Sequence, residues 1–365
     1  MAEIASPAPR PQPGDIPWRQ PARGGYPDPS LIGLPGIEQL RAMLEGRVPQ
    51  PPLSRLTGQR LIDVAPGLTT FEMPLTRWLC SSQGPISIGP LAVPADGAMA
   101  TAIQTELPPA SPYSTSELSL RLLSTARPGG CITARGRVIH RRRTIALSEV
   151  HLTDDEGRLV GHGTTLCFVA PPVKGSAPPQ PLDVMPEPAA DQATPDPFER
   201  PAQGTILGQE TFERHSGLEV LRAQIAGDLP PPPIHYLLGL APESAAAGEA
   251  AFVLPVTEWL CAPPPGRAQG GFIALLAEAG VMGAIQTKLP AGTAFAPIDL
   301  KVNFLRPLSA DGREARAAGR VLHAGRRIAV ASADVRDADG KPVAVATGSA
   351  MLLPGRPASL GIPSG

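Results

Sequence analysis

The sequence has few cysteines and few histidines, and its positive and negative charges nearly balance. Its 365 residues contain four cysteines, without a C-x-x-C spacing, and six scattered histidines. This pattern offers no metal-binding constellation, so we expect no bound metal and buried, reduced thiols. The net charge of -1 lacks the basic excess that nucleic acids or anionic membranes usually require of a partner. A small or neutral ligand fits this composition better.

A long apolar run is also missing from the N-terminal stretch M-A-E-I-A-S-P-A-P-R-P-Q-P-G. It has neither signal-peptide nor membrane-spanning length, so we expect a cytoplasmic protein. Proline, by contrast, is abundant at 47 residues, and much of it lies in residues 1–30 and about 171–203. Such segments have little apolar surface to bury. We therefore expect a disordered tail (1–30), a first domain (31–170), a linker (171–210), a second domain (211–355) and a flexible tail (356–365).

An internal repeat relates the two expected domains. G-I-E-Q-L-R-A-M-L at 36–44 matches G-L-E-V-L-R-A-Q-I at 217–225, a shift of 181 residues. The shift becomes 182 where I-Q-T-E-L-P at 103–108 matches I-Q-T-K-L-P at 285–290. Under the later shift Asp96 corresponds to Glu278, and Gly89 corresponds to Gly271. An acidic residue therefore recurs at the same place in both copies.

The segment 269–289 has the composition of a buried helix. It reads Q-G-G-F-I-A-L-L-A-E-A-G-V-M-G-A-I-Q-T-K-L and leaves almost no polar face. The segment contains one acid, Glu278, and burying a carboxylate without partners is costly. Glu278 is therefore interpreted either as a side chain that reaches the surface or pairs locally, or as a catalytic base or nucleophile. Gly270 and Gly271 lie where this helix begins, and their unpaired N–H groups predict an oxyanion hole.

Strand patterns surround the helix in each copy. Two short strand-like runs precede it, and four follow it, at 114–124, 131–140, 144–153 and 158–169 and again at 295–307, 314–323, 327–336 and 342–353. The turns D-D-E-G at 154–157 and D-A-D-G at 337–340 predict hairpins. The sequence therefore predicts an α+β protein of two tandem hotdog domains, each a curved antiparallel sheet wrapped around a long central helix. Because one copy alone leaves a sheet edge exposed, we expect an intramolecular pseudo-dimer.

From residue 36 to 169, and again from 217 to 353, the chain resembles hotdog thioesterases of the phenylacetate-pathway (PaaI) type. The resemblance is most specific at Gly270 and Gly271, at the acid seven residues later, and at D-L-K-V-N-F-L-R-P at 299–307. It implies hydrolysis of an acyl-CoA thioester by a carboxylate base or nucleophile, a polarising glycine amide and a water-positioning amide side chain. It also implies no metal or redox cofactor. Acyl-CoA is the expected partner, with no nucleic acid or membrane, and a homo-oligomer of the pseudo-dimer stays open.

Each copy departs from that family's usual pattern, W-x-x-N-x-x-G-x-x-H-G-G followed by the acid. The second copy has Gln269 at the histidine position and Ala262 or Pro263 at the asparagine position. The first copy has serine at both positions, Ser87 and Ser81. Each copy is therefore incomplete by itself.

Hotdog sites similar to these lie between two protomers, so the resemblance implies two composite sites. Each takes its acid from one copy and its glycine loop from the other. Site one combines the following residues: Asp96, Thr115, Gly270, Gly271 and the side chain of Gln269. Site two combines the following residues: Glu278, Gly89, Ser87 and Ser81.

Glu278 and Gly271 are the favoured acid and oxyanion donor, because Pro94 predicts that the helix of the first copy begins late, near that proline. Asp96 would then lie in the first helical turn and could cap free N–H groups instead. Arg143 and Arg326, beside matching hairpins, are interpreted either as solvated charges or as contacts to CoA phosphates.

Two classes of function stay open. The first is an acyl-CoA thioesterase, which the helix acid and the glycine loop favour. The second is a catalytically silent acyl-CoA-binding or regulatory protein, which the missing asparagine and histidine favour. A hotdog hydratase is less favoured, because the sequence shows no helix-borne Asp/His pair.

Overall fold

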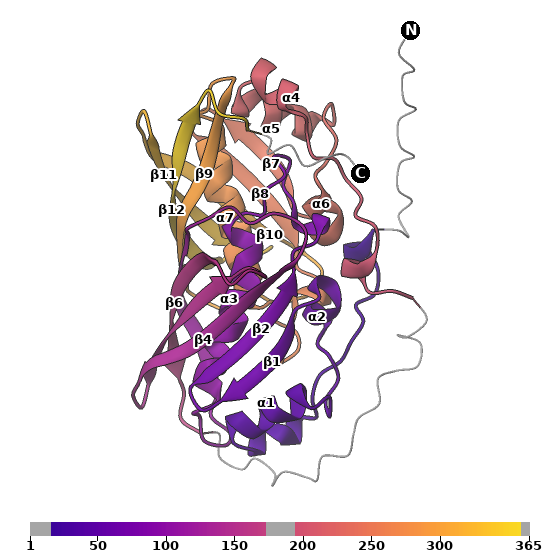
Figure 1. The fold of residues 1–365 in the computed structure, drawn as a ribbon, viewed down its shortest axis with the longest axis vertical. Helices are drawn as coiled ribbons and strands as arrows, with labels where there is room; N and C mark the ends of the chain where they lie inside the picture. Colours follow the sequence, from indigo (N-terminus) through magenta and orange to yellow (C-terminus); the bar gives the residue numbers. More distant parts are fainter. Residues whose placement is uncertain (1–15, 173–193, 359–365) are drawn as a thin grey trace.

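The computed structural model describes residues 16–172 and 194–358, and within them the repeat forms two similar domains (Figure 1). The helices and strands of the first domain are α1 (Gly36–Leu44), α2 (Pro52–Thr57), β1 (Arg60–Ala65), β2 (Leu68–Pro74), α3 (Ile88–Gln104), β3 (Tyr113–Leu122), β4 (Cys131–Arg141), β5 (Ile145–Thr153) and β6 (Leu159–Val169). Those of the second are α4 (Gln209–Arg214), α5 (Gly217–Ala226), α6 (Pro233–Leu238), β7 (Ala241–Ala246), β8 (Glu249–Pro255), α7 (Gly270–Gln286), β9 (Thr293–Phe304), β10 (Glu314–Ala324), β11 (Ile328–Arg336) and β12 (Pro342–Pro354).

All these strands belong to one 12-stranded sheet, in the order β1-β2-β4-β5-β6-β3-β9-β12-β11-β10-β8-β7. The two halves join where β3 pairs antiparallel with β9, from Glu117 opposite Asn303 to Arg121 opposite Asp299. This pairing satisfies the backbone groups that each half would otherwise leave at an open edge. The chain is thus an α+β tandem hotdog protein with a continuous sheet, and the prediction of an intramolecular pseudo-dimer is confirmed.

The long helices α3 and α7 pack against each other inside the curve of the sheet (Figure 1). Glycine permits their close approach: a Cβ added at Gly271 would lie 2.5 Å from Val93 Cα, and one added at Gly89 would lie 3.0 Å from Leu275 Cα. The start of each helix therefore lies directly against the other helix. None of the helices in the described part of the chain has the length and hydropathy to span a bilayer.

The long helix of the first copy, α3, does not begin where the sequence predicted. α3 begins at Ile88 and continues through Pro94, so the prediction that it begins near that proline is wrong. Every residue from Ile88 to Met99 is buried, and packing on all sides outweighs the local cost of one missing backbone hydrogen bond. Asp96 consequently lies in the middle of α3 and cannot cap its first turn.

Parts of the two proline-rich stretches are ordered, although the sequence predicted disorder. Residues 16–30 are packed on the domains: Gln20 O accepts a hydrogen bond from Trp259 Nε1 at 3.0 Å, and Arg23 pairs with Asp196 at 2.7 Å. Likewise Arg200 O, in the expected linker, accepts from Trp78 Nε1 at 2.9 Å. The expected disorder is therefore wrong for residues 16–30, and residues 194–210 of the linker are also ordered, because buried tryptophans supply partners that local composition does not reveal. Residues 1–15, 173–193 and 359–365 lie outside the described residues.

Candidate active site

Site one is assembled across the two copies. Asp96, on α3, is only 3% exposed. Its Oδ1 accepts a hydrogen bond from Thr115 Oγ1, on β3, at 3.1 Å, and its Oδ2 accepts from the N–H of Gly271, in the first turn of α7, at 3.2 Å. Asp96, in the first domain, thus accepts a hydrogen bond from the first turn of a helix in the second domain. This arrangement brings together the acid and the glycine loop that were expected to share a site.

The side chain of Gln269 lies beside that acid. Gln269 immediately precedes α7, and its Nε2 donates to Val93 O, on α3, at 3.0 Å. Val93 and Asp96 are three residues apart on one helix and therefore face the same side. The other end of the amide, Oε1, is buried and accepts no hydrogen bond within the described residues. Site one therefore contains a fixed amide with an unused acceptor.

Burial dominates the electrostatics of Asp96. It raises the pKa of this carboxyl from 3.8 to about 6, although hydrogen bonds from Thr115 and the backbone N–H groups of Gly271 and Gly270 oppose the rise. Both amides at the start of α7 thus point at the carboxylate. Gly271 N–H, expected to await a substrate oxygen, donates instead to Asp96 in this structure.

The acid of site two, Glu278, has fewer hydrogen-bond partners than Asp96. Glu278, on α7, is 6% exposed, and its Oε2 accepts a hydrogen bond from Ser87 Oγ at 3.2 Å. Burial raises its pKa from 4.5 to about 7, opposed only by that serine. A Cβ added at Gly89 would lie 3.1 Å from the same oxygen, so this glycine is also adjacent. Ser81 accepts a hydrogen bond from Gln83 N–H, and no hydrogen bond joins it to Glu278 in the described ranges.

The two arginines expected to contact CoA lie apart from these acids. Arg143 occupies the exposed turn between β4 and β5, and Arg326 the exposed turn between β10 and β11. Among residues 16–172 and 194–358, neither arginine has a hydrogen bond or ion pair with Asp96 or Glu278. Their contact with CoA phosphates stays a prediction.

A further buried amide, Gln59, was missed from the sequence. It lies between α2 and β1 and is 3% exposed. Its counterpart under the shift of 181 is Leu240, so the signal that could have identified it is a glutamine at a leucine position of the repeat. Gln59 also lines a pocket of about 150 Å³, together with residues of α2, β1 and the segment 196–198.

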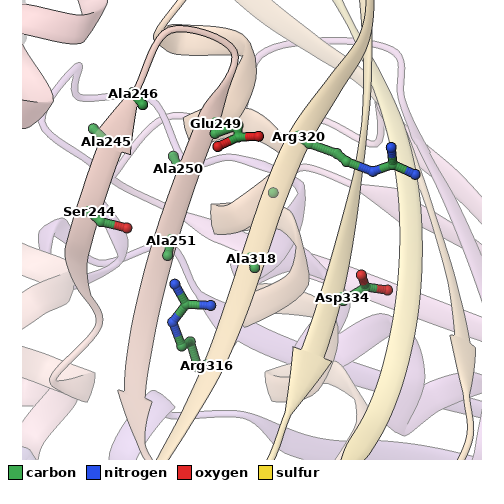
Figure 2. Close-up of a pocket in the computed structure, with 11 residues that line it drawn as sticks. Ser244, Ala245, Ala246, Glu249, Ala250, Ala251, Arg316, Ala318, Arg320 and Asp334 are labelled. Carbon is green, nitrogen blue, oxygen red and sulfur yellow. The ribbon is translucent and has the colours of Figure 1, made fainter.

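A larger hollow, of about 340 Å³, lies on the sheet of the second domain (Figure 2). Strands β7, β8, β10 and β11 form it, with small residues such as Ala251 and Ala318 between the charged side chains of Arg316, Arg320 and Asp334. Neither Asp96 nor Glu278 lines it. The hollow is therefore separate from both composite sites.

Comparison with known proteins supports the same fold. The family model of the thioesterase superfamily matches residues 266–344, which include Gln269 and Glu278. A TesB protein from Mycobacterium avium subsp. paratuberculosis is 13% identical, with 87% of this chain and 100% of that chain covered and a TM-score of 0.51.

Two further solved structures are similar at lower TM-scores. The acyl-CoA thioesterase II TesB2 from Mycobacterium marinum is 15% identical, covers 85% of this chain and 99% of that chain, and has a TM-score of 0.47. A mutant of the phenylacetic acid degradation protein PaaI from Thermus thermophilus is 22% identical, covers 32% of this chain and 97% of that chain, and has a TM-score of 0.30. No curated protein matches the chain. By its own sheet topology and the family-model match, the chain is a tandem hotdog protein whose second domain matches the thioesterase superfamily.

Proposed function

We propose that this protein hydrolyses acyl-CoA thioesters at site one, with Asp96 as the general base. The observation that carries the proposal is that site one contains both the buried Asp96 carboxylate and the unpartnered Oε1 of Gln269, whose Nε2 is held by Val93 O one helical turn from Asp96. A water molecule has two hydrogens to donate, and these two oxygens are acceptors for them. A water held in this way presents its oxygen lone pair to the carbonyl carbon of a thioester.

The environment of Asp96 suits it to take a proton. With a pKa of about 6 it is ionised at neutral pH, yet it is a stronger base than an ordinary aspartate. The hydrogen bond from Thr115 fixes the orientation of the carboxylate. As the water oxygen bonds to the thioester carbon, Asp96 takes the proton that the water loses. When the C–S bond breaks, that proton passes to the departing thiolate, which leaves a free acid and CoA.

The start of α7 supports the negative charge that develops on the thioester oxygen. N–H groups in the first turn of a helix have no intrahelical acceptor and lie at the positive end of the helix dipole. In the resting site Gly271 N–H donates to Asp96. Once Asp96 is protonated its hold on this donor weakens, so the same N–H is released towards the oxyanion as the charge moves there.

Site one is preferred over site two because its acid has more supporting partners. Glu278 accepts one hydrogen bond from a side chain, that of Ser87, and the position equivalent to Thr115 is Pro297, which has no donor. The family-model match supports thioester hydrolysis without distinguishing the two acids. We assign the chemistry to Asp96 and a structural role to Glu278.

The test is a thiol-release assay with short, long and aromatic acyl-CoAs. We expect release of CoA from at least one class, and a rate lower by about 10²–10⁴-fold in Asp96→Asn. Equilibrium binding of the same acyl-CoAs is measured in parallel. Binding without release in the wild type would overturn the proposal and identify a silent acyl-CoA-binding protein instead.

A further inference from the structure

Gln59 is a buried polar side chain that the proposed mechanism does not use. Its Oε1 is inaccessible to solvent and accepts no hydrogen bond from any described residue. Burying an amide oxygen without a partner destabilises the folded state, whereas Leu240 at the equivalent position of the second copy carries no such penalty. A glutamine at this position therefore points to a ligand that supplies the missing partner.

The position of Gln59 ties it to site one. A Cβ added at Gly97, the residue after Asp96, would lie 2.7 Å from Gln59 Nε2 and 3.5 Å from Gln269 Nε2. The two amides thus flank one point on α3. Any side chain at position 97 would displace Gln59, and glycine leaves the room that it occupies. The second copy has Ala279 and Leu240 at the equivalent positions, so the glycine and the amide occur together in only one copy.

Gln59 is the residue that relates a surface pocket to site one, although no residue of site one lines that pocket. It lines the pocket of about 150 Å³, and its amide nitrogen lies against Gly97. Arg55 and Asp196, from facing walls of this pocket, pair at 3.0 Å, which holds the segment 196–198 against α2. The pocket is therefore defined by fixed elements, and a narrow, unbranched chain suits its volume.

We propose that the thiol arm of the substrate enters site one through this pocket, and that Gln59 binds the amide of that arm nearest the thioester sulfur. The inference rests on the proposed function. In CoA a short ethylene spacer joins this amide to the sulfur, so the amide reaches one side of the site while the thioester carbon reaches the other. A glutamine side chain has an acceptor and a donor, which match the N–H and C=O of an amide.

The experiment compares two thioesters of one acyl group. The N-acetylcysteamine thioester contains the amide, and a simple alkyl thioester of equal length does not. We expect the wild type to prefer the amide-bearing substrate by about tenfold in kcat/KM, as hydrogen bonds worth about 1.4 kcal/mol would give. Gln59→Leu, which installs the residue of the second copy, should bring this ratio close to one, mainly by raising KM for the amide-bearing substrate.

Leu240→Gln is the matched control, and it should leave the ratio unchanged. If Gln59→Leu slows both thioesters equally, Gln59 is merely structural and the inference is overturned. If Gln59→Leu does not fold, Gln59→Met preserves the side-chain length for the same comparison. If the wild type hydrolyses no thioester, the proposed function fails, and calorimetric titration with CoA decides the inference separately: weaker binding by the variant supports it, and equal binding overturns it.

Discussion

Site one and site two occupy equivalent junctions of the two copies, yet their surroundings differ at almost every position. The equivalent pairs, with site one first, are Asp96 and Glu278, Thr115 and Pro297, Gln269 and Ser87, Gln59 and Leu240, and Gly97 and Ala279. Site one is the more polar junction and contains two amide side chains. Both copies thus contain a buried acid, and only site one surrounds it with a large set of polar partners.

The two acids show what these partners do. Asp96 accepts hydrogen bonds from Thr115 and from the start of α7, and its pKa is about 6. Glu278 accepts one from Ser87, and its pKa is about 7. Part of this difference is intrinsic, because the ordinary pKa is 3.8 for aspartate and 4.5 for glutamate, and the additional hydrogen bonds to the ionised form of Asp96 act in the same direction. Asp96 is therefore the acid better suited to act as a base at neutral pH.

Exchanging each acid for its amide tests the comparison most strongly. Asp96→Asn keeps the shape of the side chain and removes the base, so we expect kcat for thioester hydrolysis to fall by about 10²–10⁴-fold. Glu278→Gln, its matched control, should change kcat only a few-fold. Steady-state thiol release measures both. The opposite result, with Glu278→Gln the inactive variant, would assign the chemistry to site two.

The next comparison concerns the two glycines where α3 and α7 meet. A Cβ at position 271 would lie 2.5 Å from Val93 Cα, whereas one at position 89 would lie 3.0 Å from Leu275 Cα. We expect Gly271→Ala to lower the free energy of unfolding by about 3 kcal/mol and Gly89→Ala by less, because the overlap is more severe at position 271 and its nearest atoms all belong to the backbone of α3, whereas two of the three nearest atoms at position 89 belong to side chains. Urea denaturation measures both. Equal losses of stability in the two variants would show that the contact between α3 and α7 adapts equally well at positions 271 and 89.

The pH dependence of stability compares the acids in the folded state. A carboxyl whose pKa is raised by folding stabilises the protein below its unfolded pKa, and this contribution is lost as pH rises through its folded pKa. Between pH 5 and pH 8 the loss is about 2 kcal/mol for Glu278 and about 1 kcal/mol for Asp96. Denaturation at both pH values should therefore show a smaller decrease for Glu278→Gln than for the wild type. An unchanged decrease in that variant would mean that Glu278 is not the group that titrates.

The smallest expected effect separates the hydroxyl partners. Thr115→Val removes the hydrogen bond that lowers the pKa of Asp96, so the acid limb of the kcat profile should move to higher pH, and kcat should fall by about tenfold. Ser87→Ala removes the side-chain partner of Glu278 and should leave the profile unchanged. A pH–rate series on both variants tests this. A shift produced by Ser87→Ala would link Glu278 to catalysis.

The fold followed largely from the sequence, because strands and turns carry local signals. The run Cys131–His140 became β4, Cys131–Arg141, and Pro342–Leu353 became β12, Pro342–Pro354. Alternating side chains set such strands, and hairpin turns join them. The resemblance to hotdog thioesterases, applied to the two copies of the repeat, also implied that an acid of one copy would meet the glycine loop of the other.

The errors share a physical cause. Pro94 signals a helix boundary locally, but burial on every side of α3 outweighs that signal. The proline-rich segment containing Gln20 gives no local sign of its hydrogen bond to Trp259, 239 residues away. Gln59 follows an unremarkable P-L-S-R-L-T-G stretch, and only its distance to Gly97 relates it to site one. Long-range packing decided each of these cases.

Joining the two copies in one chain also fixes how many complete sites an assembly contains. Site one needs Asp96 from the first copy and Gln269 from the second, which meet where α3 packs against the start of α7. If two separate genes encoded the halves, like would also pair with like, and those homodimers would combine two acids without the Gln269 amide, or two amides without Asp96. Fusion excludes such products. An active-site titration should therefore count one catalytic unit per polypeptide, independent of dilution and of the relative expression of the halves.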